Sequence, residues 1–437
     1  MIRVTDEGKI KSVYVWVAYT YHIHAITGTR ESLGAMIGEL AGTAAVRRRI
    51  LQTIFPLLLT LPQRNNFKQL ARWGNRNEGT LHNWYQKELH LEIFNRSLID
   101  NYGSGDCFVI FDPCYMPKSG KRTPCLGPFW SGQAGAVKRG LELGAFAVGD
   151  LGHHTAFHLS ASLTPTAKEL AKQGKTLMGH YVDLVRQQGG QIQHFGNLLV
   201  CDGYFGVQTF VEPILQMDIC LISCLRSNAA LYYAPIPQLK GGSSKKRGRP
   251  RKKGGKIDWN NLDEQRLPIV LSDGEKIVRS GLVYVKCLKR QVRLVAVDYL
   301  REAGYLFTRK LYFCTNTEKE TLWILERYQC RFQIEFLFRD AKQFTGLTQC
   351  QSTNQTKIEN HVNLALSAVS VAKAAHWLPL PKEQRGPFSM AELKNYYYNL
   401  ALVERFSVAL GLNPTETKNN PKIKELLFSN SYADIAA

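Results

Sequence analysis

"CFVIFD", residues 107–112, is a run of apolar side chains that ends in a carboxylate. Two similar runs come later in the chain, "NLLVCD" at 197–202 and "CLISCL" at 220–225. Short continuous apolar runs between polar residues are typical of strands that are covered on both faces. Between the first two runs, residues 164–188 have the pattern of a helix. The sequence therefore predicts an α/β unit around a buried sheet.

Asp112 and Asp202 are expected at the ends of two of these strands. Carboxylates at strand ends lie exposed at the edge of such a sheet, where a site can form. A lone Asp after a strand is commonly a turn residue or a helix cap. Two such aspartates together with a third acid, Glu335, are a stronger indication of a site.

The third acid lies in "RYQCRFQIEFLFRDAK", residues 327–342. On one continuous helix of about 100° per residue, Tyr328, Arg331, Glu335 and Lys342 fall on one stripe about 60° wide. The stripe is either a solvated face with ion pairs or a carboxylate flanked by cations that bind phosphate. The side chains expected to point elsewhere, into a core, are Phe332, Phe336 and Leu337.

The 437-residue chain has a net charge of +20 and a pI near 9.5. This balance predicts a polyanionic partner, nucleic acid before membrane, although a merely soluble basic protein has the same signature. Ten Cys without a C-x2-C pair argue against a zinc knuckle and fit a reducing cytoplasm. The apolar stretch 12–26 is too short to span a membrane and is interpreted as packed structure.

Residues 66–90 have the rhythm of a helix-turn-helix within a helical region that covers residues 1–100. The side chains expected to face inward are Phe67, Leu70, Ala71, Leu81, Trp84 and Tyr85. Those with some freedom to contact DNA are Asn77, Thr80, His82, Asn83 and Lys87. Any two amphipathic helices joined by a turn give the same pattern.

A basic break separates the α/β unit from a β-rich stretch at 260–315. Residues 243–256 hold eight Lys or Arg and no acid, so this run cannot fold alone. Its "RGRP" core resembles an AT-hook that lies in the minor groove, and a non-specific basic loop explains it equally well. The β-rich stretch predicts a small antiparallel insertion.

Three converging carboxylates repel one another unless cations neutralise them. Two Mg²⁺ ions held by oxygen ligands about 3.5–4 Å apart would do so and would supply phosphodiester chemistry. On a basic protein, that chemistry points to DNA.

Tyr328-x2-Arg331-x3-Glu335-x6-Lys342 resembles the Y-R-E-K signature of bacterial transposases of the insertion-sequence-four family. "FDPCYMPKSGKRTPCLGPFWSG" and "LLVCDGYF" resemble that family's segments around its first and second Asp, and "QFTGLTQCQ" resembles the segment after its Glu. The similarity covers residues 105–375. It implies a ribonuclease H-like catalytic core with a β-rich insertion and an N-terminal helical DNA-binding domain.

By this resemblance, Asp112, Asp202 and Glu335 are the catalytic and metal-binding triad, with Mg²⁺ or substituting Mn²⁺ as cofactor. The implied enzyme is a bacterial, cytoplasmic, nucleoid-associated DDE transposase that cuts the terminal repeats of its element and joins them to target DNA. It would act as a homodimer on double-stranded DNA, with or without hairpinned ends. Trp259 is a candidate for holding a flipped base.

The resemblance divides the chain into parts. The core comprises 105–235 and 316–380, separated by the basic linker and insertion at 236–315, and the tail at 381–437 is a candidate dimerisation segment. The DNA contacts expected are Tyr328, Arg331, Lys342, Lys118, Lys121, Arg226, Lys245, Lys246, Arg247, Arg249, Arg251, Lys252 and Lys253. Two alternatives remain: a domesticated transposase that only binds DNA, and a ribonuclease H-like nuclease that only cuts.

Overall fold

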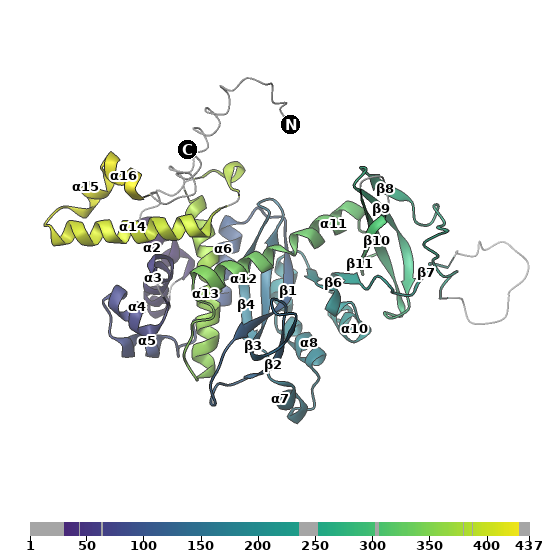
Figure 1. Ribbon diagram of the computed structural model, residues 1–437, viewed down its shortest axis with the longest axis horizontal. Helices are drawn as coiled ribbons and strands as arrows, with labels where there is room; N and C mark the ends of the chain where they lie inside the picture. Colours follow the sequence, from purple (N-terminus) through teal and green to yellow (C-terminus); the bar gives the residue numbers. More distant parts are fainter. Residues whose placement is uncertain are drawn as a thin grey trace, which may run out of the picture.

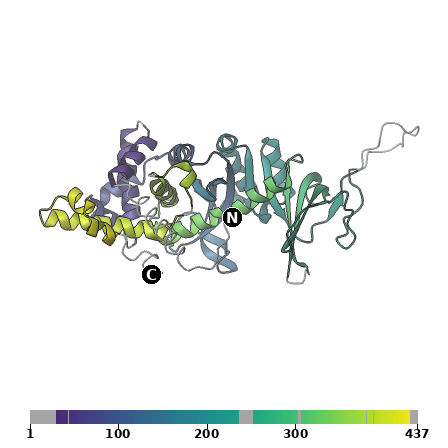
Figure 2. The same cartoon turned by 90° about the horizontal axis from the view of Figure 1, so that it is seen from above.

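The computed structural model describes residues 30–42, 44–62, 64–235, 252–301, 306–378, 380–386 and 388–427. The molecule is elongated, with helices gathered at one end and the strands of the β-rich stretch at the other (Figures 1 and 2). The stretch 12–26 and most of the basic run lie outside the described residues, so their interpretations stay predictions.

One sheet runs through the described part of the chain in the order β2-β3-β1-β5-β6-β11-β10-β9-β7. The strands of its first half are β1 (Cys107–Pro117), β2 (Gly127–Ser131), β3 (Ala136–Asp150), β4 (Thr155–Leu163), β5 (Leu198–Cys201) and β6 (Cys220–Leu225). β1, β3 and β4 pair antiparallel, and β5 and β6 continue parallel to β1. This mixed α/β arrangement is consistent with the expected ribonuclease H-like core.

Alternate residues of β1 enter two different cores. Val109 and Phe111 pack with Tyr181, while Phe108 and Ile110 belong to the cluster on the other face, which contains Leu337. Tyr181 lies on α8 (Leu177–Gln187), which follows α7 (Ala167–Lys172) and precedes α9 (Gly189–His194). Both faces of β1 are covered, and this explains why its residues 107–111 are all apolar instead of alternating with polar residues.

The β-rich stretch does not form a separate sheet. Its strands are β8 (Ile269–Ser272), β9 (Lys276–Val285), β10 (Arg290–Leu300) and β11 (Leu306–Cys314), and β7 (Leu231–Tyr233), which precedes the basic run, pairs with β9. β9, β10 and β11 are antiparallel as expected, but β11 pairs with β6 and so extends the central sheet. The short helices η1 (Gly203–Phe205) and α10 (Gln208–Gln216) connect β5 to β6.

The predicted late helix is two helices, α11 (Thr321–Cys330) and α12 (Gln333–Phe344). In Figure 1, α11 leads from the insertion strands back toward the core and α12 continues beside β4. α13 (Gln355–Trp377) comes next and packs against both α12 and β4. The chain then forms η3 (Lys382–Gln384), α14 (Met390–Ala409), α15 (Pro414–Asn419) and α16 (Pro421–Leu427).

The N-terminal region is helical as expected where it is described. Its helices are α2 (Arg30–Leu40), α3 (Ala45–Thr60), α4 (Phe67–Gly74), α5 (Glu78–Trp84) and α6 (Leu91–Tyr102). Asn75, in the left-handed conformation at φ 48°, ends α4 and makes the turn toward α5. Leu70, Leu81, Trp84 and Tyr85 are buried as predicted. Phe67 and Ala71 are half-buried.

Candidate active site

The sheet places Asp112 and Asp202 side by side. Phe111 of β1 pairs with Cys201 of the parallel strand β5, so the next residues of the two strands are neighbours, about 5 Å apart at the Cα atoms. Asp202 follows β5 directly and accepts a hydrogen bond from the Tyr204 N–H at 3.0 Å. The prediction that Asp112 ends its strand is wrong, because β1 continues to Pro117 through its pairing with β3.

A break between two helices places the third acid. The chain turns at Arg331 and Phe332, where N–H groups bond to carbonyls three residues back, and α12 then begins with Glu335 in its first turn. Arg327, near the end of α11, is buried and donates to Asp106 at 2.6 Å, which ties α11 to the residue before β1. The turn therefore lies beside the strand that carries Asp112.

Arg331 joins the carboxylates. One of its terminal nitrogens lies 3.2 Å from Glu335 Oε1 and the other 3.8 Å from Asp112 Oδ2. Arg331 and Asp112 are mostly buried, with side chains 13% and 15% exposed, while the Glu335 side chain is 42% exposed. The Nε of Arg331 is buried and has no protein partner. A single guanidinium thus provides the positive charge within reach of two of the acids.

The pKa of Asp112 reflects both its burial and the charges around it. Burial raises the pKa of Asp112 to about 7; Arg331 opposes this rise, and the charges of Asp202, Glu335 and Glu142 add to it. Burial also raises the pKa of Asp202, while the hydrogen bond from the Tyr204 backbone and the charge of Arg331 lower it. The repulsion at Asp112 indicates that the other three carboxylates lie close enough to act on its charge.

The donor chemistry suits a hard divalent cation, since carboxylate oxygens are the ligands that Mg²⁺ prefers. Among the described residues, however, no three His, Cys, Asp or Glu side chains lie close enough to hold one ion together. The described conformation instead neutralises the acids through Arg331. Asp112, Asp202 and Glu335 fit a metal site by type and by neighbourhood, with Arg331 lying where it would compete with the ion.

Sequence reasoning missed one acid beside the site, Glu142 on β3. It is buried, and its Oε1 accepts a hydrogen bond from the Tyr181 hydroxyl at 2.6 Å. Burial raises the pKa of Glu142, and the hydrogen bond from Tyr181 opposes this. A charged residue inside the otherwise apolar run 141–149 was the signal that could have found it.

The predicted stripe spans two helices, α11 and α12, separated by two residues that keep helical dihedral angles. Tyr328 is half-buried on α11, and its ring is tilted by 46° against that of Tyr312 with the centroids 4.5 Å apart. Burial raises the pKa values of the Cys224 and Cys114 thiols, and nearby Tyr328 and Lys342, respectively, oppose this rise. Arg331 and Glu335 remain paired, as the helical phase suggested.

The expectation that all three apolar neighbours of the stripe enter a core is wrong. Leu337 is buried, but Phe332 and Phe336 are 48% and 36% exposed. Their rings contact one another edge to face at 5.1 Å. This side of α12 therefore faces solvent, while the side that carries Leu337 is buried.

The remaining predicted DNA contacts are dispersed. Lys121, Arg226, Lys252 and Lys253 are exposed, and Lys118 is half-buried at the end of β1. Five of the predicted contacts lie outside the described residues: Lys245, Lys246, Arg247, Arg249 and Arg251. Roles in DNA binding stay predictions for all of them.

Trp259, the candidate for a flipped base, has one ring face occupied. The Arg309 guanidinium lies 4.0 Å from its centroid, and Arg309 is paired with Asp298. The ring is half-buried against the core. A base could stack only on the other face or after Arg309 moves.

A family model of the transposase DDE domain matches residues 154–370, from the turn before β4 into α13. This match supports a DDE transposase, and it includes Asp202 and Glu335 but not Asp112. No curated protein matches the chain. In the part of the chain that the structure describes, no helix has the length and apolar character needed to cross a membrane.

Proposed function

We propose that this chain is a DNA transposase that binds the terminal inverted repeats of an insertion sequence, cleaves the ends and joins them to target DNA. The observation that carries the proposal is the convergence of Asp112, Asp202 and Glu335 from two adjacent strands and a helix onto one electrostatic site. The transposase DDE match over residues 154–370 supports the same chemistry.

Each residue has a defined task in this proposal. Asp112, Asp202 and Glu335 would hold divalent ions, which when bound activate an attacking oxygen and neutralise charge on the leaving one. Asp112 and Asp202, fixed by paired strands, supply the rigid part of the site. Glu335, which is partly exposed at the start of a helix, supplies the adjustable part. Arg331 would turn from the carboxylates to a DNA phosphate as the ions bind.

A homodimer that brings two ends together belongs to the same proposal. Three large apolar side chains are strongly exposed at the end of α14 and just after it, namely Phe406, Val408 and Leu410. Exposed apolar groups in one place favour association. The membership in the insertion-sequence-four family and the hairpin step rest on the Y-R-E-K spacing and are proposed on that ground alone.

The test starts from the DNA on either side of the gene, searched for inverted repeats. A plasmid that carries these repeats is incubated with the protein in Mg²⁺, in Mn²⁺ or in excess chelator. Cutting at the repeat ends and joined products are expected with metal, and neither with chelator, while binding to the repeats persists. Full cutting in chelator would refute the metal-dependent reaction.

Three variants separate catalysis from binding. Asp112→Asn, Asp202→Asn and Glu335→Gln keep the shape of each side chain and remove its charge. Each should abolish cutting and joining and leave the gel shift on repeat DNA nearly unchanged. Cutting without any joined product in the native protein would instead identify a nuclease, and binding without either reaction would identify a domesticated transposase.

A further inference from the structure

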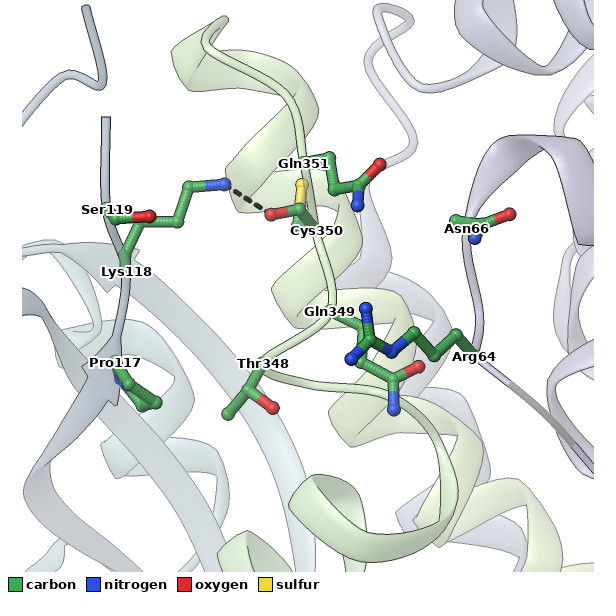
Figure 3. A pocket seen from close by; sticks show the side chains of 9 residues that line it. All are labelled: Arg64, Asn66, Pro117, Lys118, Ser119, Thr348, Gln349, Cys350 and Gln351. Atoms are coloured by element: carbon green, nitrogen blue, oxygen red, sulfur yellow. Dashed lines mark hydrogen bonds between the residues drawn. The ribbon is translucent and has the colours of Figure 1, made fainter. Parts of the chain in front are cut away.

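A hollow of about 470 Å³ lies at the junction between the helical N-terminal region and the core. In Figure 3, Lys118 and Ser119 line one side, Arg64 and Asn66 the opposite side, and segment 348–351 runs between them. A second hollow of about 280 Å³ shares Asn66 and residues 349–351 with the first. We call the two together the junction groove.

The first hollow of the junction groove offers donors rather than acceptors, whereas the second is also lined by the carboxylate of Glu78. The Oε1 of Gln349 already accepts a hydrogen bond from the Asn65 N–H at 2.6 Å, and the Oδ1 of Asn66 accepts one from the Gln69 N–H at 2.9 Å. Each side-chain amide therefore keeps its NH₂ group for a ligand. The ammonium of Lys118 uses one donor on the Cys350 carbonyl and keeps two.

The charge of the first hollow also favours a ligand that accepts hydrogen bonds. Arg64 and Lys118 are cationic, and no Asp or Glu is among the described residues that line this hollow. A ligand with several acceptor oxygens and negative charge would satisfy these groups, and the backbone of a nucleic acid has both properties. The volume exceeds what a lone phosphate needs and suits a stretch of phosphodiester backbone.

The middle wall of the groove is held in place before any ligand arrives. Gly346 adopts φ +78°, and a Cβ there would lie 2.7 Å from the Asn65 side chain. Its carbonyl accepts a hydrogen bond from buried His361 at 2.8 Å. Preorganised donors bind an anion with a smaller loss of conformational entropy than mobile ones.

We propose that the junction groove binds the phosphodiester backbone of one strand of the DNA whose end lies in the Asp112 site. The proposal rests on the transposase function and adds a second, distant contact. Lys118 follows Asp112 by six residues along or just beyond β1, so the two lie about 20 Å apart at roughly 3.3 Å per residue. At 3.4 Å per base pair, the groove contacts the backbone about six base pairs from the cut.

The test measures binding alone. In an Asp202→Asn background with chelator, the affinity for a duplex carrying the repeat is measured by fluorescence anisotropy over a series of salt concentrations. Arg64→Ala and Lys118→Ala should each reduce the slope of log affinity against log salt by about 0.9 for duplex DNA, or about 0.7 if the bound strand is unpaired. Phosphate ethylation should interfere with binding about six base pairs from the cut, and Arg64→Ala should remove this effect.

The matched control is Arg96→Ala with Lys168→Ala, which removes two exposed cations that line neither hollow. Lys118→Ala removes the hydrogen bond to the Cys350 carbonyl and could therefore affect folding. Arg64 is exposed, so Arg64→Ala keeps the test valid in that case. The proposal would be overturned if Arg64→Ala left the slope of log affinity against log salt equal to that of the parent. It would also be overturned if Arg64→Ala reduced this slope by no more than the control pair does. A failed transposase function would show separately, as native protein that cuts no repeat DNA.

Discussion

Replacing Arg331 by Ala tests whether this side chain stands in for a metal ion. At 3.8 Å from Asp112, its attraction is about 4 kcal/mol at an effective dielectric of 20. The contact with half-exposed Glu335 adds no more than about 1 kcal/mol because solvent screens it. Breaking a buried pair costs about 3–5 kcal/mol. Since Asp112, with a pKa of about 7, can take up a proton instead, we expect the lower value, about 3 kcal/mol.

The assay is thermal melting in chelator and in rising Mg²⁺. In chelator, Arg331→Ala should melt roughly 3–6 °C below the parent protein. Mg²⁺ should then stabilise the variant more than the parent, because the ion no longer competes with a guanidinium for Asp112 and Glu335. At ten times its dissociation constant, the ion contributes about 1.4 kcal/mol. Cutting of repeat DNA should still fall, since the phosphate contact proposed for Arg331 is lost.

Arg327→Ala provides the matched control. Arg327 is also buried and paired, but with Asp106, outside the three carboxylates. Its loss should lower the melting temperature without changing the response to Mg²⁺. Equal Mg²⁺ responses of Arg331→Ala and the parent, or unchanged melting of Arg331→Ala in chelator, would show that Arg331 does not compensate the acids in the way described.

Three further outcomes are expected. Burial lowers the pKa of His361 to about 4 from 6.5, so its contribution to stability is complete above pH 6.5 and is lost as the pH falls toward 4. This loss amounts to up to about 3 kcal/mol of unfolding free energy. His361→Gln should therefore flatten the fall of melting temperature between pH 6.5 and 4, and an unchanged pH profile would contradict this. In denaturant unfolding, Leu337→Ala should lower the unfolding free energy by about 2–5 kcal/mol because it leaves a core cavity. Phe336→Ala, at an exposed position, should lower it by less than about 1 kcal/mol. The reverse order would contradict the burial described. Replacing Lys252 and Lys253 by Ser should reduce the salt slope of DNA affinity by about 1.8 if both contact phosphate, whereas an unchanged slope would identify a solvated linker.

Local patterns in the sequence were sufficient for three of the core strands and did not predict β2, β3 and β4. The apolar runs ending near Asp112 and Asp202 are β1 and β5, and residues 220–225 are β6. Burial on both faces leaves a continuous apolar signature that needs no knowledge of neighbours. The relation between Arg331 and Glu335 was equally local, because residues four apart lie together even where a helix is just beginning.

Helical phase was not sufficient to predict burial. Phe332 and Phe336 were expected in a core with Leu337, but only Leu337 is buried. On a helix of about 100° per residue the two Phe lie about 100–140° away from Leu337. A helical wheel gives the direction of a side chain, but it does not give the width of the face that tertiary packing covers.

The sequence by itself determined which residue types carry charge and where three of the buried strands, β1, β5 and β6, lie. Only the tertiary structure decided that Arg331 reaches Asp112, that Glu142 of β3 adds a fourth acid, and that Arg64 faces Lys118 across the junction groove. These contacts join residues far apart in the chain. They depend on sheet register and on how the helices pack on the sheet, which are set by the whole core and leave no periodic signal in the sequence.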